Sequence, residues 1–147
     1  MIVVNDVHFK YPSGVEAIKG LSLAIKDGEF VAIMGQNGAG KTTLVKHFNG
    51  LLKPTSGCIL VDGVETTKTT VATLSKSVGF VFQNPDHQLF SETVEDEIAF
   101  ALKNFGYESV TIEKQVTWAL NLLSLEQYRK TSPFMLSGGE RKRVALA

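Results

Sequence analysis

The chain has 147 residues, of which 44% are hydrophobic and 20% are charged, a balance typical of one ordinary globular unit. Fifteen Lys and Arg residues balance fifteen Asp and Glu residues, so no overall positive field attracts nucleic acid or an anionic membrane. The single cysteine, Cys58, the lack of a secretory signal pattern, and apolar runs far short of the ~20 residues that span a membrane together predict a cytosolic chain.

The first predicted elements are two half-buried strands separated by a turn. Apolar and polar residues alternate over residues 7–11 and again over residues 21–25, which is the period of a strand with one buried face. A third strand is predicted over residues 30–34. This run is continuously apolar, as in a strand that is covered on both faces of a parallel sheet.

A glycine-rich loop follows this run directly. Residues 35–42 read GQNGAGKT, the full pattern of a phosphate-binding loop. Glycines let backbone N–H groups approach phosphate oxygens, and a helix beginning near Gly40 directs its positive N-terminus at the same anion. Lys41 is expected to reach the β and γ phosphates, and the Thr42 hydroxyl to ligate Mg²⁺. The helix is predicted to end near residues 49–50.

The rest of the chain changes from strands to helices. A short strand over residues 58–61 ends in a turn at Asp62 and Gly63, which predicts a hairpin, and a second buried strand is predicted over residues 78–82. Apolar side chains then recur at helical spacing, in one helix beginning near Val94 and another including residues 112–123. We expect a strand-rich nucleotide-binding part, residues 1–83, and a helical subdomain, residues 84–147.

A second motif, far along the chain from Lys41, leads to a family. Residues 136–140 read LSGGE and resemble the signature motif of ATP-binding cassette (ABC) ATPases. Gln83 lies where that family has its Q-loop glutamine, and Tyr11 lies where the family stacks an aromatic ring on adenine. Residues 84–90, NPDHQLF, are similar to the energy-coupling-factor and cobalt/nickel importer branch. The resemblance covers the whole chain.

The resemblance implies a fold and a function for the intact protein. The fold class is an α/β P-loop NTPase, the ABC ATPase cassette, with an N-terminal antiparallel β part, a C-terminal helical subdomain and an incomplete core sheet. The function is that of an importer's ATP-binding subunit, an ATPase that drives uptake of a metal ion or a vitamin. Expected partners are a second ABC ATPase subunit, in a homo- or heterodimer, and two membrane proteins, one for coupling and one for substrate binding. The subunit would lie peripherally at the cytoplasmic face of the membrane and bind no nucleic acid.

The resemblance also assigns roles to residues, with ATP and Mg²⁺ as the cofactors. Lys41 and Gln83 are the catalytic candidates, and Thr42 and Gln83 are the metal candidates. The expected nucleotide contacts are Tyr11, Gly35, Gln36, Asn37, Gly38, Ala39, Gly40, Lys41, Thr42, Thr43, Ser137, Gly138 and Gly139. Glu140 stands where the family usually has Gln, and we assign it no direct phosphate contact.

Several expected parts are missing, because only residues 141–147 follow the signature motif. The chain lacks a Walker B strand with its catalytic Glu and the switch His. Residues 58–62 imitate a Walker B strand, but Asp62 followed by Gly63 is already explained as a hairpin turn. We therefore expect this chain alone to be inactive in hydrolysis and to fold incompletely or marginally. The alternative is a non-catalytic nucleotide-binding or docking fragment.

Other polar residues have ordinary structural interpretations. His47 and His87 are expected to be surface or helix-face histidines, not catalysts. The acidic residues 95–97 follow Thr93 in the manner of a capped helix start and are interpreted as structural. The basic run over residues 141–143 predicts a solvated or phosphate-facing helix surface instead of a nucleic-acid site.

Overall fold

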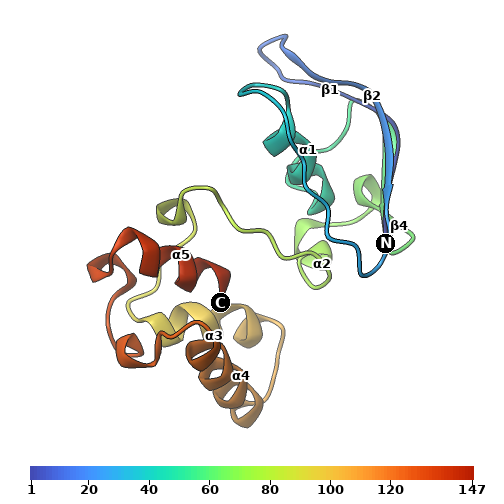
Figure 1. Cartoon of the computed structure of the whole chain (residues 1–147). Coiled ribbons are helices and arrows are strands. Elements are labelled where there is room, and N and C mark those ends of the chain that lie inside the picture. Colours follow the sequence, from blue (N-terminus) through green and yellow to red (C-terminus); the bar gives the residue numbers. More distant parts are fainter. The chain divides into compact units, whose positions relative to one another are not determined.

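The computed structural model describes all 147 residues, and the chain divides into two compact units (Figure 1). Unit 1 is Met1–Phe80 and unit 2 is Val81–Ala147. Unit 1 contains the strands and the glycine-rich loop, whereas unit 2 is helical. Each unit has its own cluster of buried hydrophobic side chains, so each can be described by itself.

Unit 1 is built on a four-stranded antiparallel sheet with the strand order β2-β1-β3-β4. The strands are β1 (Ile2–Lys10), β2 (Glu16–Ile25), β3 (Ser56–Val61) and β4 (Val64–Glu65). A tight turn joins β1 to β2, closed by the hydrogen bond from the Gly14 N–H to the Tyr11 carbonyl. The two alternating strands predicted from the sequence are confirmed.

The hairpin predicted at Asp62 and Gly63 is also confirmed. Both residues have positive φ, 48° and 79°, between the antiparallel strands β3 and β4. This is the backbone of a two-residue turn whose twist matches that of its flanking strands, and Asp-Gly is a preferred pair for it. The short apolar strand before Asp62 therefore ends in a turn, as the sequence indicates.

Helix α1 (Lys41–Phe48) packs against the sheet and closes the core of unit 1 (Figure 1). Leu44 and Phe48 lie one turn apart and are both buried, which is the spacing that places two side chains on one helical face. They join buried strand residues in a cluster that also contains Val4, Val7, Phe9, Ile18 and Ile59. Unit 1 also includes the short helices η1 (Thr66–Lys68) and α2 (Val71–Leu74).

Two predicted strands are wrong. Residues 30–34 form irregular backbone outside the sheet, and Phe30 and Met34 are 100% and 89% exposed. Residues 78–82 are also irregular, half-buried or exposed. A strand covered on both faces needs neighbours that hydrogen-bond to its edges, and all strands of this sheet pair among themselves in the order given above. Residues 30–34 and 78–82 are apolar as the sequence shows, but neither run has a neighbouring strand to pair with.

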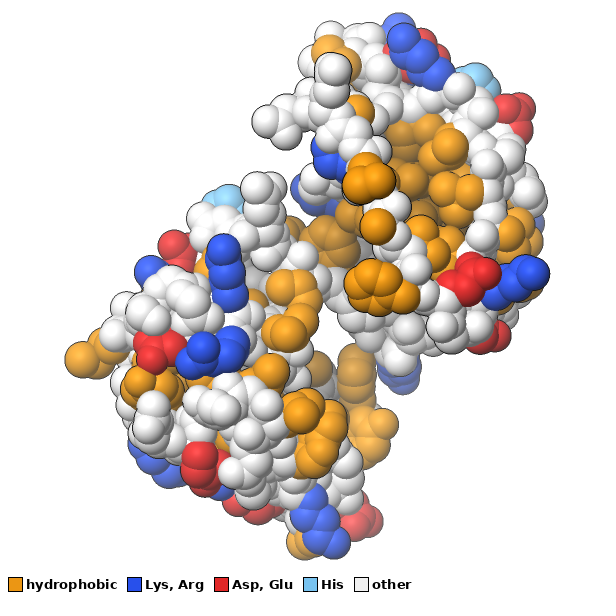
Figure 2. Space-filling model, viewed as in Figure 1, with side chains coloured by type: hydrophobic (Ala, Val, Ile, Leu, Met, Phe, Trp, Pro, Cys, Tyr) orange, Lys and Arg blue, Asp and Glu red, His pale blue; other side chains and the backbone are white.

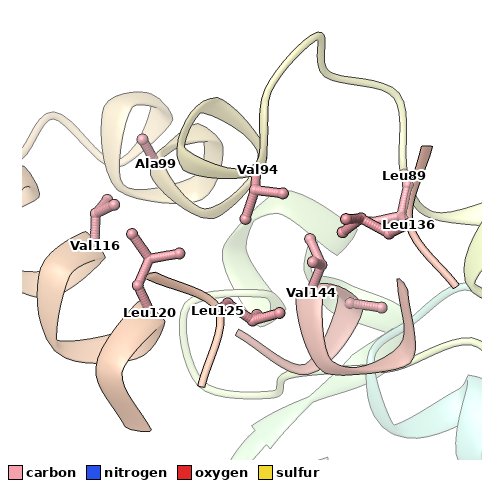
Figure 3. Close-up of a cluster of buried hydrophobic side chains, with 9 residues drawn as sticks. Leu89, Val94, Ala99, Val116, Leu120, Leu125, Leu136 and Val144 are labelled. Atoms are coloured by element: carbon pink, nitrogen blue, oxygen red, sulfur yellow. The ribbon is translucent and has the colours of Figure 1, made fainter. Parts of the chain in front are cut away.

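Unit 2 consists of helices around one apolar cluster, drawn in Figure 3. The predicted helices are confirmed as α3 (Val94–Asn104) and α4 (Ser109–Leu122), and the signature motif opens α5 (Gly138–Leu146). A single 3₁₀ turn, η2 (Pro85–His87), precedes α3, and two more, η3 (Glu126–Tyr128) and η4 (Pro133–Met135), lie between α4 and α5. The cluster consists of Leu89, Val94, Ala99, Val116, Leu120, Leu125, Leu136, Val144 and Ala145.

Helix α3 begins as its sequence predicts. The Thr93 side chain accepts a hydrogen bond from the Asp96 N–H at 3.2 Å, and three acidic residues occupy the first turn. Acids at this end of a helix are stabilised by the helix dipole. None of the helices in the chain is both long enough and apolar enough to cross a membrane.

Candidate functional site

The glycine-rich loop has a backbone that only glycine accepts at its last position. Gly35, Gly38 and Gly40 have φ values of 156°, 85° and 87°, in the region that favours glycine. A Cβ on Gly40 would lie 2.5 Å from the carbonyl oxygen of Ala17, whereas a Cβ on Gly38 would meet no atom within 4 Å. The loop is therefore packed closely against β2 at Gly40 and is open at Gly38.

Helix α1 begins directly after this loop, and its N-terminal end is electropositive. No side chain caps its N-terminus and no acidic residue occupies its first turn, so its first N–H groups remain available to an anion. The Lys41 ammonium donates hydrogen bonds to the carbonyls of Gly35 and Gln36, at 2.7 and 2.8 Å. The lysine thus lies across the loop with no carboxylate paired to it. A phosphate group is the kind of ligand that this arrangement suits.

Tyr11 lies next to the same helix. Its hydroxyl is 2.9 Å from Thr43 Oγ1, and its half-exposed ring packs edge-on against Phe9, with the ring centroids 4.8 Å apart. Phe9 packs in the same way on His47, at 4.7 Å. The structure therefore brings Tyr11 and the first turn of α1 together, as a site that includes both requires.

His47 is fully buried, although its sequence context predicts a surface or helix-face histidine. Its Nδ1 lies 2.7 Å from the Thr43 carbonyl oxygen, and burial is the main cause of a pKa below the ordinary value. The ring is therefore neutral at pH 7, with the proton on Nδ1, because a carbonyl only accepts. His47 holds the backbone of Thr43 from inside the core. His87, in contrast, is exposed as predicted.

A groove of about 760 Å³ lies beside the loop. It runs between β2 and the irregular residues 31–34 and reaches Gly38, Gly40 and Lys41. Its walls include Ile18, Leu21, Leu23, Ile33 and Leu44. Figure 2 shows hydrophobic side chains gathered on one face of unit 1. The groove is lined mainly by apolar side chains, together with Glu16 and Lys19 of β2 and Lys41 at the loop.

The signature residues form the start of α5 in unit 2. Ser137 caps the helix by accepting a hydrogen bond from the Glu140 N–H at 3.4 Å, and Glu140 accepts one from the Ser137 N–H at 2.8 Å. Hydrogen bonds from Ser137 and from the Tyr128 hydroxyl lower the pKa of Glu140 to about 2. Glu140 is therefore ionised at neutral pH and faces Ser137. Its role is to close the capping box.

Gly138 and Gly139 are exposed, and a Cβ added to either would meet no atom within 4 Å. Their surroundings leave room for a large ligand or a partner chain. Gln83 is exposed too, in an irregular segment at the beginning of unit 2. The expected site residues are thus divided between the units: Tyr11 and residues 35–43 belong to unit 1, and Gln83 and residues 137–139 to unit 2.

The expected Mg²⁺ site has few protein ligands, namely Thr42 and Gln83. No group of three or more His, Cys, Asp or Glu side chains is placed to hold a metal ion. Thr42 is exposed in the first turn of α1. Of the basic run, Lys142 and Arg143 are exposed as predicted, but Arg141 is half-buried and paired with Asp86 at 2.8 Å. Arg141 therefore makes an internal contact that the basic run in the sequence does not predict.

Comparison with known proteins places this geometry in context. Residues 18–147 match the family model described as ABC transporter. The energy-coupling factor transporter ATP-binding protein EcfA of Methanoculleus marisnigri is 48% identical over 147 residues, which cover 100% of this chain and 53% of that protein. Across the curated relatives, the chain spans between 26% and 56% of their length.

Two solved structures share the fold. CbiO1 of Clostridium perfringens, part of the ABC transporter complex cbiONQ, has a TM-score of 0.85 and 39% identity, covering 99% of this chain and 59% of that chain. A dimeric ATP-binding cassette in a post-hydrolysis state, bound to ADP and Pi, has a TM-score of 0.87 and 32% identity, covering 99% of this chain and 67% of that chain.

Proposed function

This chain belongs to the ABC transporter family, and from that premise we propose that it is the phosphate-binding and signature-bearing part of an ATP-binding subunit. The α/β cassette fold expected from the sequence is confirmed by the solved structures that share it. In a chain of the relatives' full length, the subunit binds ATP with Mg²⁺ and hydrolyses it to drive import through a membrane partner.

The observation that carries the proposal is the electropositive start of α1. Its N-terminus has neither a side-chain cap nor an acidic residue, and Lys41 is held over the loop by two carbonyls. Phosphate oxygens would accept hydrogen bonds from the N–H groups of residues 35–43 and from the Lys41 ammonium. Tyr11, next to Thr43, offers its ring to adenine, and the exposed Thr42 hydroxyl is available to Mg²⁺.

The role of these residues in phosphoryl transfer is to hold and neutralise the phosphates. Catalysis of this transfer depends on positioning and on charge compensation, and two loop carbonyls hold the Lys41 ammonium at the phosphate loop. Mg²⁺, when bound, neutralises phosphate charge, and Gln83 is proposed to contact the metal or a water. This 147-residue chain has no Walker B glutamate in its sequence, and we propose that it does not hydrolyse ATP alone.

The signature residues are proposed to serve a second subunit. In a homo- or heterodimer, Ser137, Gly138 and Gly139 of one subunit would face the nucleotide held by the other. The open surroundings of the two glycines support this role, as does the dimeric state named for a solved structure that this chain resembles.

The importer assignment rests on the names of relatives. One is an energy-coupling factor transporter ATP-binding protein and another is part of a cbiONQ complex. We accordingly propose a transmembrane coupling protein and a substrate-binding membrane subunit as partners, a peripheral location at the cytoplasmic face, and a metal ion or vitamin as the transported substrate. Nucleic acid is not proposed as a ligand, since the net charge is zero.

Nucleotide binding is tested by titrating this chain with a fluorescent ATP analogue and Mg²⁺. Lys41→Ala is expected to weaken binding by about tenfold or more, because it removes a charge-assisted contact worth about 1.5 kcal/mol or more. Lys46→Ala is the matched control, since Lys46 lies in the last turn of the same helix, and its loss should leave the affinity unchanged. Equal affinities for all three proteins would contradict the proposed site.

Hydrolysis separates the proposal from its alternative, a non-catalytic nucleotide-binding or docking module. The test compares phosphate release by this chain with that by a chain of the relatives' full length. Turnover by the long chain alone is expected. Equal turnover by both would contradict the claim that this chain lacks catalytic parts, and turnover by neither would favour the alternative.

A further inference from the structure

The segment that follows Gln83 is joined to helix α5, which carries the signature motif, by two side-chain contacts. Arg141 Nη1 donates to Asp86 Oδ1 at 2.8 Å. Gln88 Nε2 donates to the Ala145 carbonyl at 2.7 Å, while its Oε1 accepts from the Phe82 N–H at 3.2 Å. Gln88 therefore joins the residue just before Gln83 to α5.

Apolar packing holds the same segment in place. Pro85 is buried, and Leu89 belongs to the core cluster together with Leu136 and Val144. Figure 3 shows Leu89 and Leu136 side by side, with Val144 close to them. The Asn84 side chain also accepts a hydrogen bond from the Asp86 N–H at 3.1 Å, so the turn that presents Asp86 is fixed locally.

On the other side, Arg141 is rigidly joined to the signature serine. The Arg141 N–H donates to the Ser137 carbonyl at 2.9 Å, one helical turn away. The reciprocal bonds between Ser137 and Glu140 lock that turn. Arg141 Nε is buried without a hydrogen-bond partner, so the ion pair with Asp86 is the main compensation for this half-buried cation.

We propose that Asp86, Gln88 and Arg141 form a latch that positions Ser137 relative to Gln83. The latch transmits a displacement of the Gln83 segment to the first turn of α5, because each side is held by its own hydrogen bonds and the contacts between them are short. The three residues are positioning residues and touch no reacting atom. This inference rests on the proposed ATPase function, since it names a further requirement of the same site.

The latch is tested in a chain of the relatives' full length that hydrolyses ATP. Asp86→Asn and Arg141→Gln are each expected to lower kcat by about fivefold to tenfold with KM for ATP unchanged, a coupling typical of paired residues. A reversed pair, Asp86→Lys with Arg141→Glu, should recover most of the loss. Lys142→Gln is the matched control, because Lys142 is exposed on the same helix and makes no ion pair.

A second measurement follows α5 itself. Hydrogen exchange at the amides of residues 138–141 should become faster in each single variant and return toward wild type in the reversed pair. Unchanged kcat and exchange in the single variants would overturn the latch. A loss of melting temperature that the reversed pair does not restore, with kcat unchanged per folded molecule, would show a structural contact only. Failure of the wild-type protein to bind ATP would instead contradict the proposed function.

Discussion

Residues of the phosphate loop are constrained in different ways. At Gly40 a side chain would clash with the Ala17 carbonyl oxygen, whereas at Gly38 only the positive φ disfavours other residues. The Lys41 side chain is held by hydrogen bonds to two loop carbonyls. Motif spacing predicted all three residues, because the pattern records which backbone and charge a phosphate needs. It could not predict that His47 would be buried behind Thr43, because that contact depends on how α1 packs against β1.

Replacing Gly38 and Gly40 by alanine in turn should distinguish the cost of backbone strain from the cost of a steric clash. Gly38→Ala places a side chain at positive φ in open space and should destabilise unit 1 by about 1 kcal/mol. Gly40→Ala has the same strain and also brings Cβ to 2.5 Å from the Ala17 oxygen, so the loop must move. We expect a clearly larger loss of stability in Gly40→Ala, measured by urea unfolding, and a loss of nucleotide binding that Gly38→Ala shows less strongly. Equal stabilities would contradict the close packing at Ala17.

At the scale of elements, the sequence predicted the strands and helices that pair or pack with segments close to them in the chain. The hairpin at Asp62, the pair β1 and β2, and the amphipathic helices α3 and α4 all formed as expected. Residues 30–34 and 78–82 did not form strands, although their apolar pattern is as clear as that of β3. Periodicity shows which faces need burial, but it does not show whether a neighbouring strand exists.

One ion-pair network joins the helices of unit 2. Arg129 donates to Glu95 at 2.7 Å and to Glu113 at 2.5 Å, so it connects the first turn of α3 with α4. Its side chain is only 22% exposed, whereas the Lys103–Asp96 pair on α3 is largely exposed on both sides. Arg129→Gln should therefore destabilise unit 2 by about 1 to 2 kcal/mol. Lys103→Gln, the control, should cost less than about 0.5 kcal/mol.

The same network predicts a pH dependence. Hydrogen bonds from Lys130 and Arg129 hold the pKa of Glu95 below its ordinary value of 4.5. A carboxyl with a depressed pKa contributes stability above its ordinary pKa and loses that contribution as the pH falls through the folded value. Removing Arg129 raises the pKa of Glu95, so acid unfolding of Arg129→Gln should begin at a higher pH than that of wild type. Circular dichroism from pH 7 to 2 measures this, and coincident curves would contradict it.

At the scale of the molecule, two apolar clusters organise the two units separately. Unit 2 encloses its cluster with helices that the sequence predicted (Figure 3). In unit 1, the sheet and α1 cover most of the apolar face, but the groove beside β2 and the exposed residues 30–34 leave hydrophobic surface uncovered. The curated relatives are longer than this chain, which spans 26% to 56% of them. Additional strands in such a chain would have both a backbone edge to pair with and an apolar surface to bury.

We therefore predict that residues 30–34 become a buried strand in a chain of the relatives' full length. Phe30 and Met34, now 100% and 89% exposed, would lose most of that exposure, and burying two such side chains is worth about 3 to 6 kcal/mol. Hydrogen exchange at the amides of residues 31–34 should be about a hundredfold slower in the long chain, the protection expected when opening costs about 3 kcal/mol. Amides of β1 that pair with β2 are the internal control, because their partners are present in both chains. Rapid exchange of residues 31–34 in both proteins would show that the apolar run does not form a buried strand in either.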